Sequence, residues 1–107
     1  MYHMKIIQKA VKTWINKNGS KWSAYADYCH LVEEIGELGE ALTVKHGERQ
    51  AGDGALGFAD HSDIEEEIGD VIFSAIVLAN KFDVDLDKCF EKTFKRYDKK
   101  VERRINR

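Results

Sequence analysis

Apolar residues spaced as on one side of an α-helix are the feature of this sequence that most limits its fold. Between residues 25 and 46 the chain carries Leu31, Ile35, Leu38 and Leu42, and this period is that of a helix rather than a strand. The chain contains no proline, so nothing forces a helix to stop and turns must come from Gly, Asn, Asp and Ser. The sequence therefore predicts long helices.

Four segments fit this description. Helices are expected at about residues 3–17 and 25–46, from Ser62 to the segment KFDVD, and from Asp85 through Ile105. Ser62 has a glutamate three residues after it, which is the spacing of a capping box. Asp85 is the expected cap of the last helix. No segment shows the alternation of a strand, so the predicted fold class is all-α, a four-helix bundle.

Residues 47–61 lie between the second and third predicted helices and contain four glycines without a clear period. Gly47 is a natural stop for the second helix. A loop of this length is either functional or mobile, or a tolerated surface insertion, and the sequence leaves both open. With 107 residues, of which 43% are hydrophobic, the chain is expected to form a single domain, residues 1–107, with one core.

The overall charge excludes some partners. The chain has 17 basic and 19 acidic residues, a formal net charge of −2, so it has no general attraction to nucleic acid or acidic membranes. Cys29 and Cys89 form no C-x-x-C pair and are expected to be buried or half-buried free thiols. No signal peptide is apparent, and the apolar stretch VIFSAIVLA is too short to cross a bilayer. We therefore expect a cytoplasmic protein that binds neither nucleic acid nor membranes.

Two short acidic segments repeat one pattern. EEIGEL places Glu34 and Glu37 three residues apart, and EEEIGDV does the same with Glu67 and Asp70. Residues three apart share one face of a helix, and both pairs border the apolar stripe of their helix. If these helices pack by their stripes, the four carboxylates face each other, and their repulsion favours a bound cation. Oxygen ligands suit Mg²⁺ or Mn²⁺.

Each acidic pair also has a blander explanation and a competitor. A single acidic pair on a helix is most often a solvated face, and the repetition beside core residues is what favours a site. Gly36 and Gly69 lower helix propensity and are expected to let a neighbouring helix or a ligand approach. Zinc is disfavoured by scattered histidines. A di-iron bundle usually has Glu-x-x-His twice, whereas here His30 precedes Glu33.

The last predicted helix is rich in lysine and arginine, including Lys92 and Arg96. A solvated basic face is the simplest explanation of these charges. Beside a metal–carboxylate groove, however, they would balance phosphate oxygens. Of the tryptophans, Trp14 is expected in the core, and Trp22, in a loop, is the better candidate for stacking on a base.

Three segments together resemble the MazG-like nucleotide pyrophosphohydrolases, an all-α superfamily. They are LVEEIGELGEA, EEEIGDVIF and LDKCFEKTFKRYDKKVERR, and the resemblance covers roughly residues 25–104. It departs upstream, where KWSAYADYCH replaces the Cys-Pro-Trp-Asp and Gln-Thr-His of full-length relatives, and where base recognition would be expected. The chain also has one catalytic unit instead of two in tandem.

The resemblance implies an Mg²⁺-dependent enzyme, with Mn²⁺ as a substitute, that cleaves nucleoside triphosphates to monophosphates and pyrophosphate. It implies a role in cleansing the nucleotide pool and a homodimer or homotetramer whose sites can borrow residues from a neighbour. The residues that would hold the metal are Glu34, Glu37, Glu67 and Asp70.

The remaining roles complete the hypothesis. Glu33 would bind metal or orient the attacking water, either Glu33 or Glu37 would accept its proton, and Lys92 and Arg96 would meet the phosphates. The alternatives are a non-enzymatic helical interaction module and, less favoured, a di-iron carboxylate protein.

Overall fold

The computed structural model describes residues 2–19, 21–47 and 63–106. These residues form four α-helices and no strand: α1 (Met4–Asn18), α2 (Ala24–Lys45), α3 (Ile64–Lys81) and α4 (Leu86–Ile105). The all-α fold predicted from the apolar periodicity is therefore confirmed. The expected loop at 47–61 lies, beyond Gly47, outside the described residues.

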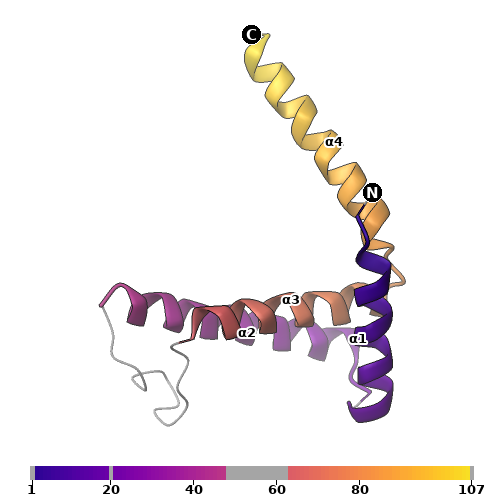
Figure 1. The fold of residues 1–107 in the computed structure, drawn as a ribbon, viewed down its shortest axis with the longest axis vertical. Coiled ribbons are helices and arrows are strands. Elements are labelled where there is room, and N and C mark those ends of the chain that lie inside the picture. Colours follow the sequence, from indigo (N-terminus) through magenta and orange to yellow (C-terminus); the bar gives the residue numbers. More distant parts are fainter. Residues whose placement is uncertain (1, 20, 48–62, 107) are drawn as a thin grey trace.

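Two of the helices form the body of the molecule. α2 and α3 run antiparallel as a hairpin, and α1 packs across the end of α3 (Figure 1). α4 meets α1 near its own start and then leads away from the hairpin (Figure 1). α3, which contacts both α1 and α2, is the central helix of the chain.

Acidic and hydroxyl side chains begin three of the helices. Ser23 accepts a hydrogen bond from the amide of Ala26 at the start of α2. Asp85 accepts from two amides of the first turn of α4, as predicted. The predicted capping box of α3 is wrong, because Asp63 is the cap and accepts from the amide of Glu66. Ser62 lies outside the described residues.

The ends of α2 and α3 are made by left-handed residues. Gly47 follows α2 with a φ of +74°, which confirms it as the stop of that helix. After α3, Asp83 takes a φ of 53°, and the amides of Asp83 and Val84 donate back to the carbonyls of Asn80 and Ala79 at 3.2 and 3.0 Å. This is a Schellman motif, built on an aspartate because Asp tolerates this conformation better than most residues.

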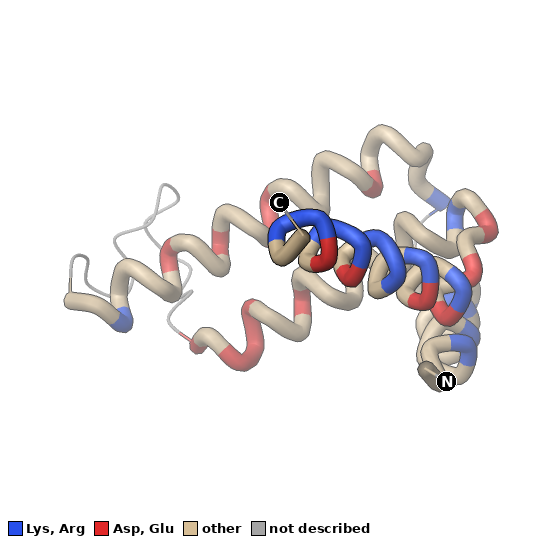
Figure 2. The backbone as a smooth tube through the Cα atoms, turned by 90° about the horizontal axis from the view of Figure 1, so that it is seen from above, with Lys and Arg blue, Asp and Glu red and all other residues tan. Residues whose placement is uncertain are grey.

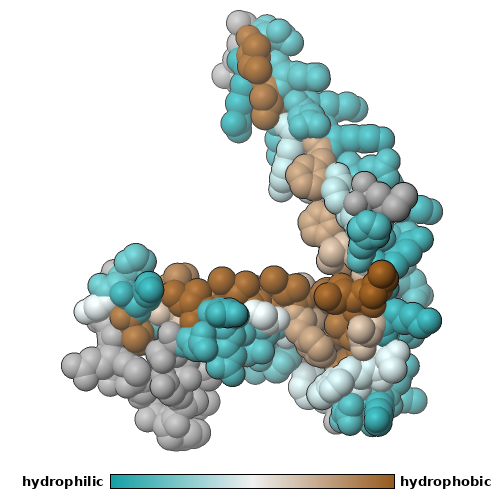
Figure 3. Space-filling model, viewed as in Figure 1, coloured by the Kyte–Doolittle hydropathy of each residue, from teal (hydrophilic) through white to brown (hydrophobic). Residues whose placement is uncertain are grey.

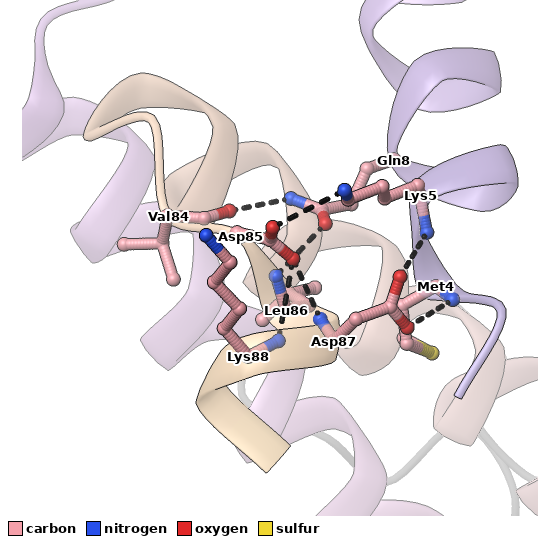
Figure 4. A network of polar contacts seen from close by, with 8 residues as sticks. All are labelled: Met4, Lys5, Gln8, Val84, Asp85, Leu86, Asp87 and Lys88. Atoms are coloured by element: carbon pink, nitrogen blue, oxygen red, sulfur yellow. Dashed lines mark hydrogen bonds and ion pairs between the residues drawn. The ribbon is translucent and has the colours of Figure 1, made fainter. Parts of the chain in front are cut away.

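The first turns of α1 and α4 cap each other, as Figure 4 shows. The carboxylate of Asp87 in α4 accepts from the amides of Met4 and Lys5, at 2.8 and 3.3 Å. Free amides and the helix dipole at the start of α1 favour this negative charge. In return, Gln8 Oε1 in α1 accepts from the amide of Leu86 at 3.0 Å.

Gln8 also fixes the turn between α3 and α4. It is buried, and its Nε2 donates to the carbonyl of Val84 at 2.8 Å and to Asn80 Oδ1 at 3.0 Å. Asn80 Nδ2 in turn donates to the Gln8 carbonyl. One side chain thus satisfies buried polar groups on both sides of the turn, and it sets where α4 begins.

The apolar core of the described residues is small. Val11, Ala41 and Ile76 are buried, whereas Ile35, Ile72 and many other large apolar side chains are half exposed. Figure 3 shows apolar side chains along the edge of the α2–α3 hairpin and along the facing side of α4. Cys29 and Cys89 are free and exposed, so the expectation that they would be buried or half-buried is wrong.

None of the described helices has the length and apolar character that a membrane span needs.

Replacing Gln8 tests the junction of α1 with the α3–α4 turn. Gln8→Ala removes three side-chain hydrogen bonds and leaves the Val84 carbonyl and Leu86 amide without them, so we expect a loss of about 2–4 kcal/mol in the free energy of unfolding. Urea unfolding at one protein concentration measures it. Lys9→Ala, an exposed neighbour on α1, should change stability by less than about 0.5 kcal/mol. Equal stability of the two variants would contradict this account.

Candidate functional site

Three carboxylates come together between α2 and α3. Glu34 from α2 meets Glu67 and Asp70 from α3, and one oxygen of each lies within 4.8 Å of the others. The antiparallel hairpin sets the first acidic segment beside the second, and Figure 2 shows acidic positions on neighbouring stretches of the two helices. We call Glu34, Glu67 and Asp70 the carboxylate cluster.

Burial makes this cluster electrostatically unfavourable. Glu67 is 4% exposed, and Glu34 Oε2 is buried and has no hydrogen-bond partner among the described residues. Burial and the charges of Glu37 and Asp70, together with a hydrogen bond to Glu37, raise the pKa of Glu34 from 4.5 to about 7, and the charge of His30 opposes this. A divalent cation fits such a donor set, because it replaces repulsion with attraction and supplies a partner for buried oxygens.

His30 is a neighbour of the cluster that the sequence analysis missed. Its Nε2 lies 3.2 Å from Glu34 Oε1, and its Nδ1 lies 3.9 Å from Glu33 Oε2. The i, i+4 spacing of His30 and Glu34 would have predicted this contact. The search for a di-iron pattern drew attention only to Glu33. The cluster itself contains carboxylates alone, which suits a hard ion better than iron held by Glu-x-x-His pairs.

The other two predicted acids occupy different positions. Glu37 is close enough to Glu34 to hydrogen bond with it and to raise its pKa. The Glu33 side chain is 72% exposed and lies beside the cluster instead of in it. Gly36 and Gly69 are exposed, and a Cβ added at either would meet nothing within 4 Å. Among the described residues, therefore, no helix of the same chain uses the space that these glycines leave.

The predicted phosphate-binding residues are far along the chain from the cluster. Lys92 and Arg96 lie on α4, whose basic positions are seen in Figure 2, and α4 leads away from the hairpin (Figure 1). Arg96 donates to Thr93 Oγ1 at 3.0 Å. Within one chain, the fold does not bring these two residues to the carboxylates.

An aromatic pocket lies next to the cluster. It has a volume of about 520 Å³, and Trp14 and Trp22 both line it. Trp22 stands edge-on to His30, with ring centres 5.4 Å apart, so the predicted stacking candidate lies close to the carboxylates. Trp14 is 53% exposed, and the expectation that it belongs to the core is wrong, because α1 presents it to the pocket.

Fold and site together define an all-α protein with a carboxylate cluster held between two antiparallel helices. The family model of the MazG nucleotide pyrophosphohydrolase domain matches residues 26–107. The chain belongs to this family, and it is a hydrolase of the nucleotide pyrophosphohydrolase class.

Known proteins support the assignment over most of the chain. The uncharacterized protein YpjD of Bacillus subtilis (strain 168) is 31% identical over 96 residues, 89% of this chain and 83% of that protein. The crystal structure of YpjD, described as a candidate pyrophosphatase, matches with a TM-score of 0.73 and 30% identity, covering 91% of this chain and 94% of that one.

A second crystal structure matches nearly as well. It is the Bacillus-conserved MazG protein, described as a nucleotide pyrophosphohydrolase, with a TM-score of 0.69 and 30% identity over 91% of this chain and 90% of that one.

The raised pKa of Glu34 predicts how the metal-free protein responds to pH. Between pH 4.5 and about 7, folded Glu34 holds a proton that the unfolded chain has released. This contribution to stability is fully present below pH 4.5 and is lost as the pH rises through 7, amounting to up to about 3 kcal/mol. Glu34→Gln should remove it.

Thermal unfolding in EDTA at pH 5, 6, 7 and 8 measures this effect. Compared with wild type, Glu34→Gln should gain stability steadily between pH 5 and pH 8. Glu33→Gln is the matched control, because its exposed side chain makes the same change one residue away, and it should follow wild type. A constant difference between Glu34→Gln and wild type across this range would refute a raised pKa.

Proposed function

We propose that this protein is an Mg²⁺-dependent nucleoside triphosphate pyrophosphohydrolase. It would cleave deoxynucleoside triphosphates, ordinary or damaged, between the α and β phosphorus to give a monophosphate and pyrophosphate. Its role would be to cleanse the cytoplasmic nucleotide pool. The observation that carries this proposal is the buried carboxylate cluster of Glu34, Glu67 and Asp70, since phosphate chemistry needs a cation where such carboxylates would otherwise repel each other.

The cluster and Glu37 would hold the ion. Mn²⁺ would substitute for Mg²⁺, because both accept oxygen ligands. When bound, such an ion neutralises charge on phosphate oxygens and lowers the pKa of water. The oxygens of Glu34, Glu67 and Asp70 lie close enough to act together, and the antiparallel hairpin fixes their spacing before substrate arrives.

The remaining steps need a base and a counter-charge. Glu33 or Glu37 would accept the proton of the attacking water. Glu33 suits this role because its exposed side chain lies beside the cluster and not within it, while Glu37 suits it through its position next to Glu34. Lys92 and Arg96 would steady the leaving pyrophosphate.

A homo-oligomer is the second part of the proposal. The apolar stripe of α4 remains exposed, with Phe94 and Val101 each 50% exposed. The edge of the hairpin that faces it is apolar as well (Figure 3). A second copy could lay its hairpin against this α4 and receive the first hairpin against its own, which would bury both surfaces by a two-fold arrangement. The assembly would be a homodimer or a homotetramer.

An oligomer would also explain where the basic residues act. Lys92 and Arg96 lie on the side of α4 away from its apolar stripe, given 3.6 residues per turn. Since they are not brought to the cluster of their own chain, a neighbouring copy would have to present this side of its α4 to the phosphates. A partner other than a second copy would instead favour the helical interaction module.

Nucleotide hydrolysis tests the first part. With Mg²⁺ and a panel of deoxynucleoside triphosphates, we expect pyrophosphate release in step with monophosphate formation, abolished by EDTA and restored by Mg²⁺ or Mn²⁺. Glu67→Gln should lower kcat/KM at least about 100-fold, because it removes a buried ligand charge. Glu66→Gln, the same change at an exposed neighbour, should stay within about twofold of wild type. Absence of turnover on every nucleotide, or release of orthophosphate alone, would sink the proposal.

Light scattering tests the second part. The wild-type protein should have the mass of at least two chains, and Val101→Asp should shift it toward one chain, because a carboxylate in an apolar interface is costly to bury. Lys99→Asp introduces the same residue on the opposite side of α4 and should leave the mass unchanged. A monomeric wild-type protein, or the same mass for both variants, would contradict the proposed interface.

A further inference from the structure

The aromatic pocket has the size and walls of a site for a small planar ring. It has a volume of about 520 Å³ and lies between α1, the start of α2 and the second half of α3, within the range of small-molecule sites. Trp14 stands edge-on to Phe73 at 5.8 Å, and Trp22 stands edge-on to His30 at 5.4 Å. Aromatic walls of this kind stack on bases regardless of sequence.

The pocket lies beside the carboxylate cluster. His30 lines it and also contacts Glu34 of the cluster at 3.2 Å. Phe73 and Ser74, which line it from α3, follow Asp70 by about one helical turn. Along α2, Asp27 precedes Glu34 by seven residues, which is about 10 Å. This is comparable to the span from the α-phosphate of a nucleotide to the far edge of its base.

A buried ion pair lines the part of the pocket away from the cluster. Asp27 is only 6% exposed, and its Oδ2 lies 3.3 Å from Lys81 Nζ. No hydrogen bond of good geometry reaches Asp27 Oδ2 from the described residues. Lys81 Nζ donates to the Trp22 carbonyl at 2.6 Å, and an ammonium group has three N–H donors. The pair therefore offers the pocket an acceptor with spare capacity beside a donor.

We propose that this pocket holds the nucleobase of the substrate and that Asp27 and Lys81 determine which base it accepts. The proposal rests on the function proposed above and adds the substrate class. A carboxylate only accepts hydrogen bonds, so Asp27 takes a proton donor from the base, and its buried position suits the exocyclic amino group, which projects furthest. Lys81 donates to the neighbouring ring nitrogen or carbonyl.

This arrangement favours bases that carry an amino group, such as cytosine and adenine, over thymine and uracil. At the corresponding position, thymine and uracil present a carbonyl oxygen, which would face the carboxylate oxygen of Asp27 without a hydrogen between them. A site built around a buried polar group discriminates strongly against a ligand that leaves this group unpaired. We therefore expect dCMP to bind about tenfold more tightly than dTMP.

Tryptophan fluorescence measures this binding without hydrolysis. The protein in EDTA is titrated with dCMP, dAMP, dTMP and dUMP, and the quenching of Trp14 and Trp22 reports occupancy. Tenfold tighter binding of dCMP and dAMP supports the proposal, and equal binding of all four, or no quenching, overturns it. Trp22→Phe should reduce the quenching by dCMP.

Asp27→Asn tests the specificity role directly. The amide can donate where the carboxylate could not, so the ratio of dCMP to dTMP affinity should fall at least about tenfold. Asp98→Asn, the same change on exposed α4, should leave the ratio as in wild type. A uniform loss of affinity for all four nucleotides would identify the Asp27–Lys81 pair as a purely structural link between α2 and α3, and it would overturn the proposal.

Two further measurements keep the conclusions separate. If Asp27→Asn does not fold, Lys81→Gln at a partly exposed position should also lower the dCMP to dTMP ratio, and an unchanged ratio would overturn the proposal. Pyrophosphate release from all four triphosphates without base preference would support the enzyme and overturn the base pocket. Selective binding without any hydrolysis would support the pocket and overturn the proposed reaction.

Discussion

Negative charge concentrated between α2 and α3 is the constraint on which the rest of this structure depends. Glu34, Glu67 and Asp70 are held within a few ångströms of one another and two of them are nearly buried, although separation in water would be electrostatically cheaper. The raised pKa of Glu34 expresses this cost. The hairpin, its caps and the hydrogen bonds of Gln8 stabilise a fold that keeps the carboxylates together, and a cation would convert their repulsion into binding.

Much of the fold could be predicted from the sequence, because the governing interactions are local. Apolar periodicity located all four helices, and Asp85 and Gly47 were correct as helix ends. The doubled acidic segments predicted a cluster, because helical spacing places both acids of a pair on one face. The cap of α3 was missed because Asp63 and Ser62 are both good caps, and the choice between them depends on the path of the chain before the helix.

Contacts between distant segments could not be predicted in the same way. Trp14 follows the apolar stripe of its helix, yet it faces a pocket, because α1 crosses only the end of α3. Lys92 and Arg96 have the residue types that phosphates require, but the direction of α4 separates them from the acids. Asp27 and Lys81 are 54 positions apart in sequence and carry no motif, so only the hairpin reveals their pairing.

Calorimetric titration of the metal-free protein with Mn²⁺, without nucleotide, tests the central claim most directly. At pH 8 the account predicts saturable binding to each wild-type chain. It also predicts that the double variant Glu34→Gln/Glu67→Gln, which removes two of the clustered charges, binds at least about tenfold more weakly. Equal binding by the two proteins, or no binding to the wild-type chain, would show that the carboxylates between α2 and α3 do not form a cation site.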